Sequence, residues 1–350
     1  MNVRRTPVVA AVLLGVSAVV AGQQQRPQEE GFRFRSGVEL INVTATVTDS
    51  SGRFVPGLAM DDFVVYEDGQ PQQVTHFSNE RVPVSLGIAI DTSGSMRGEK
   101  IRSAREALGR FLGDLLDADD EIFLYQFSDN PELVQGWTTD RRRLHRALGG
   151  MSANGGTALY DTVAEALPLA QRGERRKKAL LVSSDGNDTT SMTQPEELRQ
   201  IVQESEVLVY AIAIDAAGEP TFNRGGQPRF PPIPFPVPGR RPPIWPPTFP
   251  VPPGGGGGGW QGGRWQANDR ANIYALRQLT NDSGGRTEVV REARDLDPAT
   301  ASIADELTKQ YYLAYPSPQL RDGRWHTIDV KVRSATYRVR ARKGYIAAAQ

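Results

Sequence analysis

A single segment, residues 84–96, restricts the possible folds of this chain more than any other. It reads VSLGIAIDTSGSM, a largely apolar run that ends in Asp91, Ser93 and Ser95. A run this apolar predicts a strand buried on both faces, which is typical of the parallel sheets of α/β proteins. Open sheets of this kind bind ligands beyond the carboxyl ends of their strands. The segment therefore predicts a central strand with three side-chain oxygens at the ligand-binding edge of a sheet.

Residues 82–310 alternate between strand-like and helix-like patterns. The stretches KKALLVSS and EVLVYAIAID are nearly as apolar as the first strand, and apolar residues recur at helical spacing from Ile101 to Leu115 and from Leu159 to Ala170. Strands that alternate with helices predict a doubly wound, mainly parallel α/β sheet that is Rossmann-like and covered on both faces. We expect this sheet to be at least five strands wide.

The two flanking segments, residues 33–80 and 311–348, have a different pattern. Both contain runs in which apolar and polar residues alternate, such as VELINVTATVTD and WHTIDVKV, and the first has an Asp68-Gly69 turn. Each segment alone supplies too few strands for a stable core. We therefore expect the two β-rich segments to pair into one small β-sandwich, with the α/β domain inserted between them.

Residues 216–268 interrupt the α/β pattern. Thirteen prolines lie between Pro228 and Pro253, and six glycines follow from Gly254 to Gly259. Proline lacks a backbone donor and a glycine run has high chain entropy, so this composition predicts a disordered insertion with an extended arm and a flexible tether. The PxxP matches in it leave open whether it binds a partner or none.

The first 21 residues indicate export. Arg4 and Arg5 precede an apolar run that is shorter than the roughly 20 residues needed to cross a bilayer, and small residues precede Gly22. We predict a signal peptide over residues 1–21 and no stable membrane span after its cleavage, with an uncleaved anchor as the alternative. The expected location is the periplasm, the envelope or the exterior of a bacterium.

Composition excludes several classes of partner and chemistry. The 41 basic and 41 acidic residues cancel, so net charge indicates neither nucleic acid nor an acidic membrane surface as a partner. The chain has no cysteine, which excludes disulfides, thiolate nucleophiles and thiolate zinc sites. Stability must therefore come from packing.

Two further residues extend the oxygen-bearing loop after the first strand. Thr157 follows a Gly-Gly pair at the start of a predicted helix, and Asp185 follows the apolar strand KKALLVSS. Both are expected at the same edge of the sheet as Asp91, Ser93 and Ser95. Carboxylate and hydroxyl oxygens are hard ligands that suit Mg²⁺, with Mn²⁺ or Ca²⁺ as alternatives, and suit zinc or copper poorly.

The three motifs DTSGS (91–95), GGT (155–157) and SSDG (183–186) resemble the metal-ion-dependent adhesion site of von Willebrand factor type A domains. The resemblance implies that the two serines and Thr157 bind the metal directly, while Asp91 and Asp185 act directly or through water. It also implies that an acidic side chain of a protein partner completes the metal's coordination. The flanking strands resemble a group of exported, mainly acidobacterial proteins related to these domains, which implies no particular activity.

The residue pattern does not favour catalysis. His76, His145 and His326 lie in different segments at no spacing typical of a zinc site or triad, and Ser95 lacks the GxSxG elbow of serine hydrolases. We expect a metal-dependent, adhesion-like protein-binding module and no enzyme. The alternatives are a structural scaffold of an envelope complex and a metal-dependent hydrolase. Ser93 and Ser95 alone would also be compatible with a helix cap, and Asp188 is interpreted as a turn residue rather than a ligand.

Overall fold

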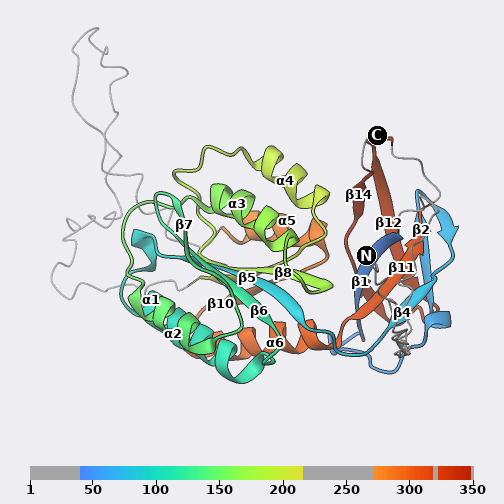
Figure 1. Cartoon of the computed structure of the whole chain (residues 1–350), viewed down its shortest axis with the longest axis horizontal. Coiled ribbons are helices and arrows are strands. Elements are labelled where there is room, and N and C mark those ends of the chain that lie inside the picture. The colour runs from blue at the N-terminus through green and yellow to red at the C-terminus, as the bar shows by residue number, and fades with distance from the viewer. Residues whose placement is uncertain (1–39, 216–271, 318–321, 348–350) are drawn as a thin grey trace, which may run out of the picture. The chain divides into compact units, whose positions relative to one another are not determined.

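The computed structural model describes residues 40–215, 272–317 and 322–347. These residues form a six-stranded, mainly parallel sheet with helices on both faces, and two four-stranded antiparallel sheets (Figure 1). The predicted fold class is confirmed. The predicted signal segment 1–21 and the insertion 216–268 lie outside the described residues. None of the helices in the described ranges combines the length and the apolar character needed to cross a bilayer.

The central sheet has the strand order β10-β9-β8-β5-β6-β7. Every neighbouring pair is parallel except the last, in which β7 runs antiparallel to β6 at the edge. The strands are β5 (Val84–Asp91), β6 (Glu121–Phe127), β7 (Pro131–Thr138), β8 (Lys177–Ser184), β9 (Leu208–Ile214) and β10 (Thr287–Val290). Strand β7 was not among the predicted strands, because its residues are partly exposed and show no clean alternation.

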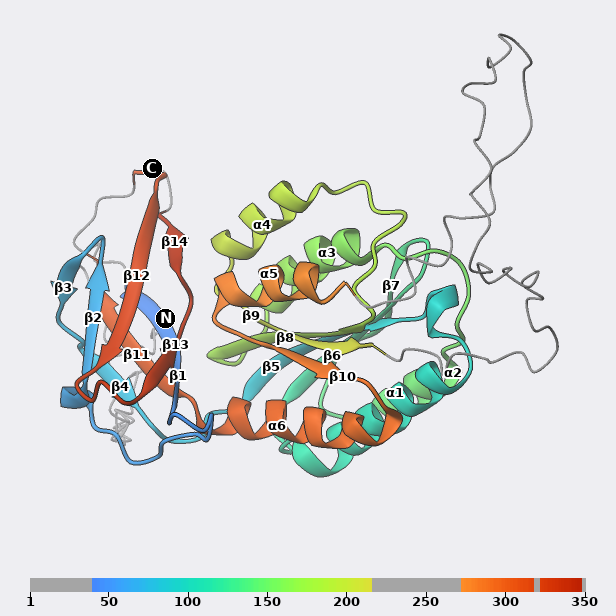
Figure 2. The same ribbon diagram turned by 180° about the vertical axis from the view of Figure 1, so that it is seen from behind.

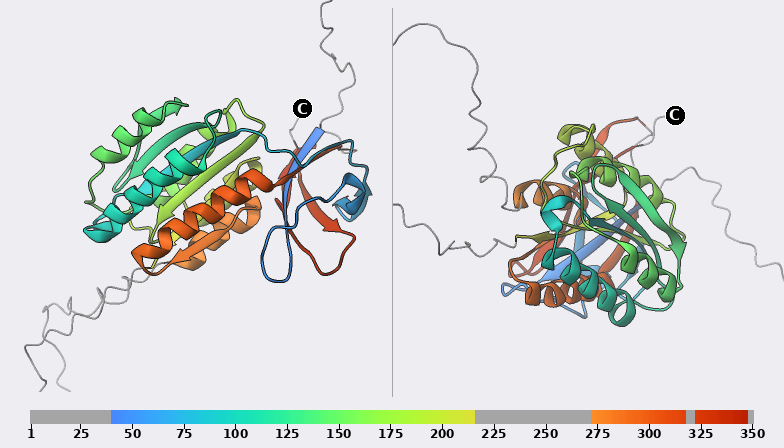
Figure 3. Two further views of the ribbon diagram at one scale, coloured as in Figure 1. Left: turned by 90° about the horizontal axis from the view of Figure 1, so that it is seen from below. Right: turned by 90° about the vertical axis from the view of Figure 1, so that its left-hand side faces the viewer.

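Helices cover both faces of this sheet (Figure 2). One face carries α1 (Glu99–Arg110), which continues into a π-helical turn (Phe111–Leu115), α2 (Arg141–Gly150) and α6 (Leu296–Lys309). The other carries α3 (Leu159–Gln171), α4 (Pro195–Glu204) and α5 (Ile273–Ser283). Helices α1 and α6 lie side by side, as the view from below shows (Figure 3). Short 3₁₀ turns occur at Met60–Asp62, Gly94–Met96 and Ala293–Asp295.

Strand β5 lies at the centre of the sheet and is buried along its whole length. Its side chains divide between two cores, with Leu86, Ile88 and Ile90 on the α1 side and Ala89 on the α3 side. Gly87 allows the Phe123 ring to pack directly on the strand, because a methyl group there would lie 2.2 Å from the ring's Cζ. This two-sided burial is the physical reason for the continuous apolar run in the sequence.

The remaining strands form a β-sandwich from both ends of the chain. One sheet has the order β13-β1-β11-β4 and the other β14-β12-β2-β3, so each contains N-terminal and C-terminal strands. Val43, Val65, Leu313 and Ile328 lie in their shared core. The strands are β1 (Leu40–Thr48), β2 (Phe63–Glu67), β3 (Gln70–Gln72), β4 (His76–Ser78), β11 (Tyr311–Pro316), β12 (Trp325–Val332), β13 (Arg338–Arg340) and β14 (Gly344–Ile346).

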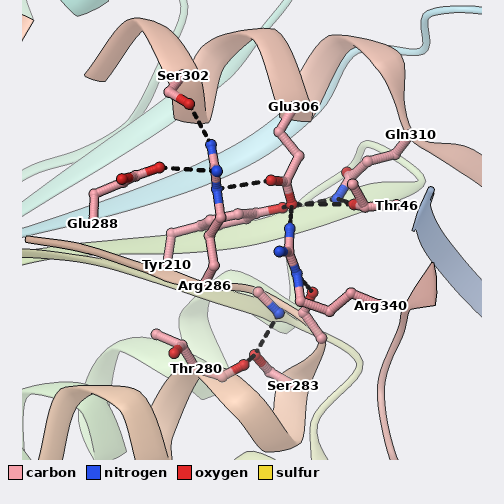
Figure 4. Close-up of polar contacts among 12 residues, drawn as sticks. Thr46, Tyr210, Thr280, Ser283, Arg286, Glu288, Ser302, Glu306, Gln310 and Arg340 are labelled. Carbon is pink, nitrogen blue, oxygen red and sulfur yellow. Dashed lines mark hydrogen bonds and ion pairs between the residues drawn. The ribbon is translucent and has the colours of Figure 1, made fainter. Parts of the chain in front are cut away.

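A buried polar cluster joins the sandwich to the α/β part (Figure 4). At its centre is Glu306 of α6, whose side chain is 6% exposed. Oε1 of Glu306 accepts hydrogen bonds from Tyr210 Oη of β9 (2.9 Å) and from Thr46 Oγ1 of β1 (3.1 Å). Arg286 Nε lies 2.8 Å from Oε2, and Arg340 of β13 pairs with Oε1. One carboxylate thus connects helix and strands from both parts of the fold.

Candidate metal centre

The five predicted ligands come from three loops at one edge of the central sheet. Asp91 is the last residue of β5, Ser93 and Ser95 follow in the next turn, and Thr157 precedes α3. Asp185 follows β8, which pairs directly with β5 and is in parallel register with it, with Ile90 opposite Ser183. Because both strands end at the same edge, the structure places the loops that follow them side by side.

Asp91 is fully buried and firmly held. Its Oδ1 accepts a hydrogen bond from the Ser93 backbone N–H (2.8 Å), and its Oδ2 accepts one from Ser184 Oγ (2.6 Å). Burial raises the pKa of Asp91 to about 6, hydrogen bonds from the two serines oppose this rise, and the nearby Asp185 carboxylate adds to it. Ser184 was not recognised in the sequence. Its position directly before Asp185, on a strand next to β5, was the available signal.

Ser93 and Ser95 point their hydroxyl groups toward one another. Their Oγ atoms are 2.9 Å apart, with Ser93 buried and Ser95 exposed. Ser93 is the N-cap residue directly before the 3₁₀ turn Gly94–Met96, yet its side chain forms no capping hydrogen bond, and Gly98 caps α1. The arrangement therefore gives no support to a capping role for this pair, and it brings two neutral oxygens together in the turn that follows Asp91.

The Thr157 loop is tied to the same turn. The Gly94 N–H donates to the Gly155 carbonyl (2.9 Å), and the Thr157 N–H donates to Thr189 Oγ1 (2.8 Å). Thr157 itself is buried, and among the residues that the structure describes its hydroxyl has no hydrogen-bond partner. Backbone bonds thus hold this residue in place while its side-chain oxygen stays available to a ligand.

Asp185 has a buried oxygen without a partner. Its Oδ1 accepts a hydrogen bond from the Asn187 N–H (3.2 Å), but within the described ranges Oδ2 has none. An unpaired buried carboxylate oxygen is costly, and the Asp185 carboxylate also lies close enough to Asp91 to raise the pKa of that second buried acid. A bound cation would pair with the free oxygen of Asp185 and would also offset the repulsion between the two buried carboxylates. The donor set, two carboxylates and three hydroxyls, fits a hard divalent ion such as Mg²⁺, Mn²⁺ or Ca²⁺.

Two other aspartates support the loops of this site. Asp188 accepts hydrogen bonds from the Tyr160 N–H (3.0 Å) and from Ser191 Oγ (2.6 Å), so it holds the start of α3 as well as its own turn. Asp129 accepts one from the Gly156 N–H (2.7 Å) and was missed in the sequence. It follows β6 at the same sheet edge, and that position was the signal that could have identified it.

The histidines lie elsewhere. His76 and His326 belong to sandwich strands β4 and β12, and His145 belongs to α2, where its ring packs against α1. His326 is held between the carboxylates of Asp68 (2.8 Å) and Asp322 (3.1 Å). No histidine therefore stands beside Ser93 or Ser95 as a general base would.

Sequence comparison identifies one domain. Residues 86–187, which include all five predicted ligands, match the sequence model of the von Willebrand factor type A domain. Among curated proteins, the inter-alpha-trypsin inhibitor heavy chain H4 of Sus scrofa is 31% identical over 134 residues, and that of Mus musculus is 27% identical over 198 residues. These alignments cover 35% and 52% of this chain, but only 14% and 20% of the two relatives.

Two solved structures of bacterial proteins align with this chain. A von Willebrand factor type A protein from Catenulispora acidiphila aligns over 90% of this chain and 75% of its own, with 12% identity and a TM-score of 0.45. The conserved hypothetical protein BatB from Bacteroides thetaiotaomicron aligns over 65% of this chain and 98% of its own, with 18% identity and a TM-score of 0.43.

Proposed function

We propose that this chain, which contains a von Willebrand factor type A domain, is an exported protein-binding module that recognises an acidic side chain of its partner through a divalent cation. Domains of this type commonly mediate protein–protein interaction. The metal dependence, the acidic group and the export to the bacterial envelope or exterior are our proposal. Export rests on the signal-like residues 1–21.

One observation carries the metal part of this proposal. Asp91 and Asp185 are both buried, Oδ2 of Asp185 has no hydrogen-bond partner, and in the described part of the chain neither carboxylate forms an ion pair. Buried acids are normally paired with a cation or neutralised by protonation. Three hydroxyls, of Ser93, Ser95 and Thr157, stand on the same loops. This combination supports a cation held by the five residues.

The residue types favour an ion that can bind a partner over an ion that the protein encloses completely. Mg²⁺ takes about six oxygens, and it keeps water wherever protein ligands are missing. Ser93, Ser95 and Thr157 contribute neutral oxygens, so an ion bound directly through these three hydroxyls alone would keep much of its positive charge, and Ser95 is exposed at the rim. When bound, a divalent ion would supply an attractive position for an incoming carboxylate oxygen. Hydrogen bonds among the protein's own residues hold the loops in place.

Substitution of Asp185 tests the proposal. We expect Asp185→Asn to weaken Mn²⁺ binding at least tenfold, because it removes a buried charge and keeps the side chain's shape. The measurement is calorimetric titration with Mn²⁺. Asp329→Asn, an exposed aspartate on β12 of the sandwich, is the matched control and should bind Mn²⁺ like the unchanged protein. Equal affinity in the Asp185→Asn variant would contradict the metal site.

A second measurement addresses partner binding. Proteins of the source organism's envelope are captured on the full-length chain with Mg²⁺ and again with EDTA, and capture is expected to need Mg²⁺ and Asp185. Capture that is unaffected by EDTA would favour the scaffold alternative. Turnover of a hydrolysable substrate that disappears in Asp91→Ala would favour the hydrolase instead.

A further inference from the structure

The two most exposed large apolar side chains of residues 40–215, 272–317 and 322–347 belong to segments that are hydrogen-bonded to Asp161 of α3 and to Asp185. Met192 is 86% exposed and Tyr274 is 72% exposed, while the next, Leu133 on β7, is 44% exposed. Full exposure of such side chains is unfavourable in water, and Met and Tyr are enriched in protein interfaces. Their attachment to elements that carry or follow predicted ligands calls for a functional explanation.

Met192 is held outward by a rigid loop. This loop runs from Asp185 to α4, and the Met192 N–H donates to both carboxylate oxygens of Asp161 (3.1 and 3.0 Å). The Thr193 N–H adds a bond to Asp161 Oδ1 (2.8 Å). Asp161 lies in the first turn of α3, just after Thr157. The backbone on both sides of Met192 is therefore fixed to the helix that follows a predicted ligand, and the side chain stays in solvent.

Tyr274 belongs to a helix whose start is hydrogen-bonded to the Asp185 loop. It lies in the first turn of α5, whose cap residue Asn272 donates its backbone N–H to the Asp185 carbonyl (2.7 Å). The packing here is close, because a methyl group on Gly186 would lie 2.7 Å from the Asn272 carbonyl oxygen. Tyr274 is therefore two residues from a group bonded directly to a predicted ligand.

The positively charged side chain of Arg97 completes this surface. Arg97 is exposed, and its Cζ lies 4.0 Å from the position of a methyl group on Gly94, between Ser93 and Ser95. Its Nε donates to the Ala153 carbonyl (3.3 Å). In the described part of the chain, its guanidinium has no acidic partner. A surface arginine fixed in this way can bind a carboxylate with its remaining N–H groups.

We infer that this edge is a recognition surface for a protein loop in which one acidic residue lies between apolar side chains. The inference rests on the proposed function and specifies the partner's chemistry. One carboxylate oxygen would bind a cation held by the five residues, Arg97 would donate to the other oxygen, and Met192 and Tyr274 would contact the flanking apolar residues. A small, well-desolvated cluster of this kind carries most of the affinity in protein interfaces.

Displayed peptides test the surface. The probe is a phage library with one fixed Glu between randomised positions, selected on the full-length chain in Mg²⁺. We expect apolar residues to be enriched beside the Glu. The double variant Met192→Ser, Tyr274→Ser should lose at least tenfold in affinity for a selected peptide and keep its Mn²⁺ affinity. Arg97→Gln should lower the affinity for the selected peptide several-fold, and Arg97→Lys should lower this affinity less.

The control is Met60→Ser, which changes an exposed methionine of the sandwich and should bind the selected peptide normally. Peptide binding that needs Mg²⁺ and the fixed Glu, but is unchanged in the double variant, contradicts the inferred recognition surface and leaves the proposed function intact. Enrichment of polar residues beside the Glu, or the absence of any enriched sequence, also contradicts the inferred recognition surface. Binding that survives both EDTA and replacement of the Glu by Gln overturns the proposed function and this inference with it.

Discussion

Replacing Glu306 by alanine should destabilise the protein strongly, because this carboxylate is the common acceptor of the cluster in Figure 4. The change removes the hydrogen bonds from Thr46 (3.1 Å) and Tyr210 (2.9 Å) and leaves Arg286 and Arg340 without their shared anion. Removal of one partner from a buried ion pair costs about 3–5 kcal/mol, because the other partner stays buried and uncompensated.

The remaining contacts of the two arginines place the effect at the lower end of this range. Arg286 keeps Glu288 (2.9 Å) and Ser302 (2.6 Å), and Arg340 keeps the Gly284 carbonyl (3.1 Å). The two side chains are 26% and 31% exposed, so water can reach them in part. We therefore expect a loss of about 3 kcal/mol in the free energy of unfolding, which corresponds to a fall of about 6–12 °C in Tm for a domain of this size.

Chemical denaturation followed by circular dichroism measures this loss. The control is Glu288→Ala, which removes a partner of the same Arg286 from a more exposed position, with 27% of the side chain accessible. Exposed ion pairs contribute about 0–1 kcal/mol, so the control should be close to the unchanged protein. If Glu306→Ala lost no more stability than Glu288→Ala, the central role of Glu306 would be refuted.

Two further predictions concern stability. Burial lowers the pKa of His326, but its hydrogen bonds to Asp68 and Asp322 outweigh this and raise the pKa above its usual value. The protonated histidine therefore stabilises the fold below about pH 6.5, and this contribution is lost as the pH rises through the folded-state pKa. The urea midpoint should fall over that range and should be less pH-dependent in His326→Gln. Gly87→Ala should cost about 1–3 kcal/mol, because the new methyl group overlaps the Phe123 ring. A thermal melt unchanged from that of the parent would contradict this.

Much of the fold was predictable because its signals are local. The strand β5 is apolar on both faces, and the helices α1 and α3 repeat their apolar residues at helical spacing. The edge strand β7 was missed for the opposite reason: it is partly exposed and its register with β6 shifts near Leu124, so no regular pattern marks it.

The candidate site was only partly visible in the sequence. Asp91, Ser93 and Ser95 stand together in one loop, and Thr157 and Asp185 could be added because each ends or begins an element at the same sheet edge. Their assignment as metal ligands stays a prediction. Ser184 and Asp129, which hold Asp91 and the Gly156 loop, were not identified, because their roles depend on which loops become neighbours.

The sequence by itself determined the α/β sheet, the β-rich flanks and the oxygen-rich loops, since hydrophobic period and motif spacing are properties of contiguous residues. Only the tertiary structure decided that β1 lies between β11 and β13, and that Glu306 meets Thr46, Arg286 and Arg340. It also decided that Met192 and Tyr274 are exposed on segments hydrogen-bonded to Asp161 and Asp185. Such contacts join residues that are far apart in the chain. They form because they bury side chains and pair charges, and no local sequence pattern records either effect.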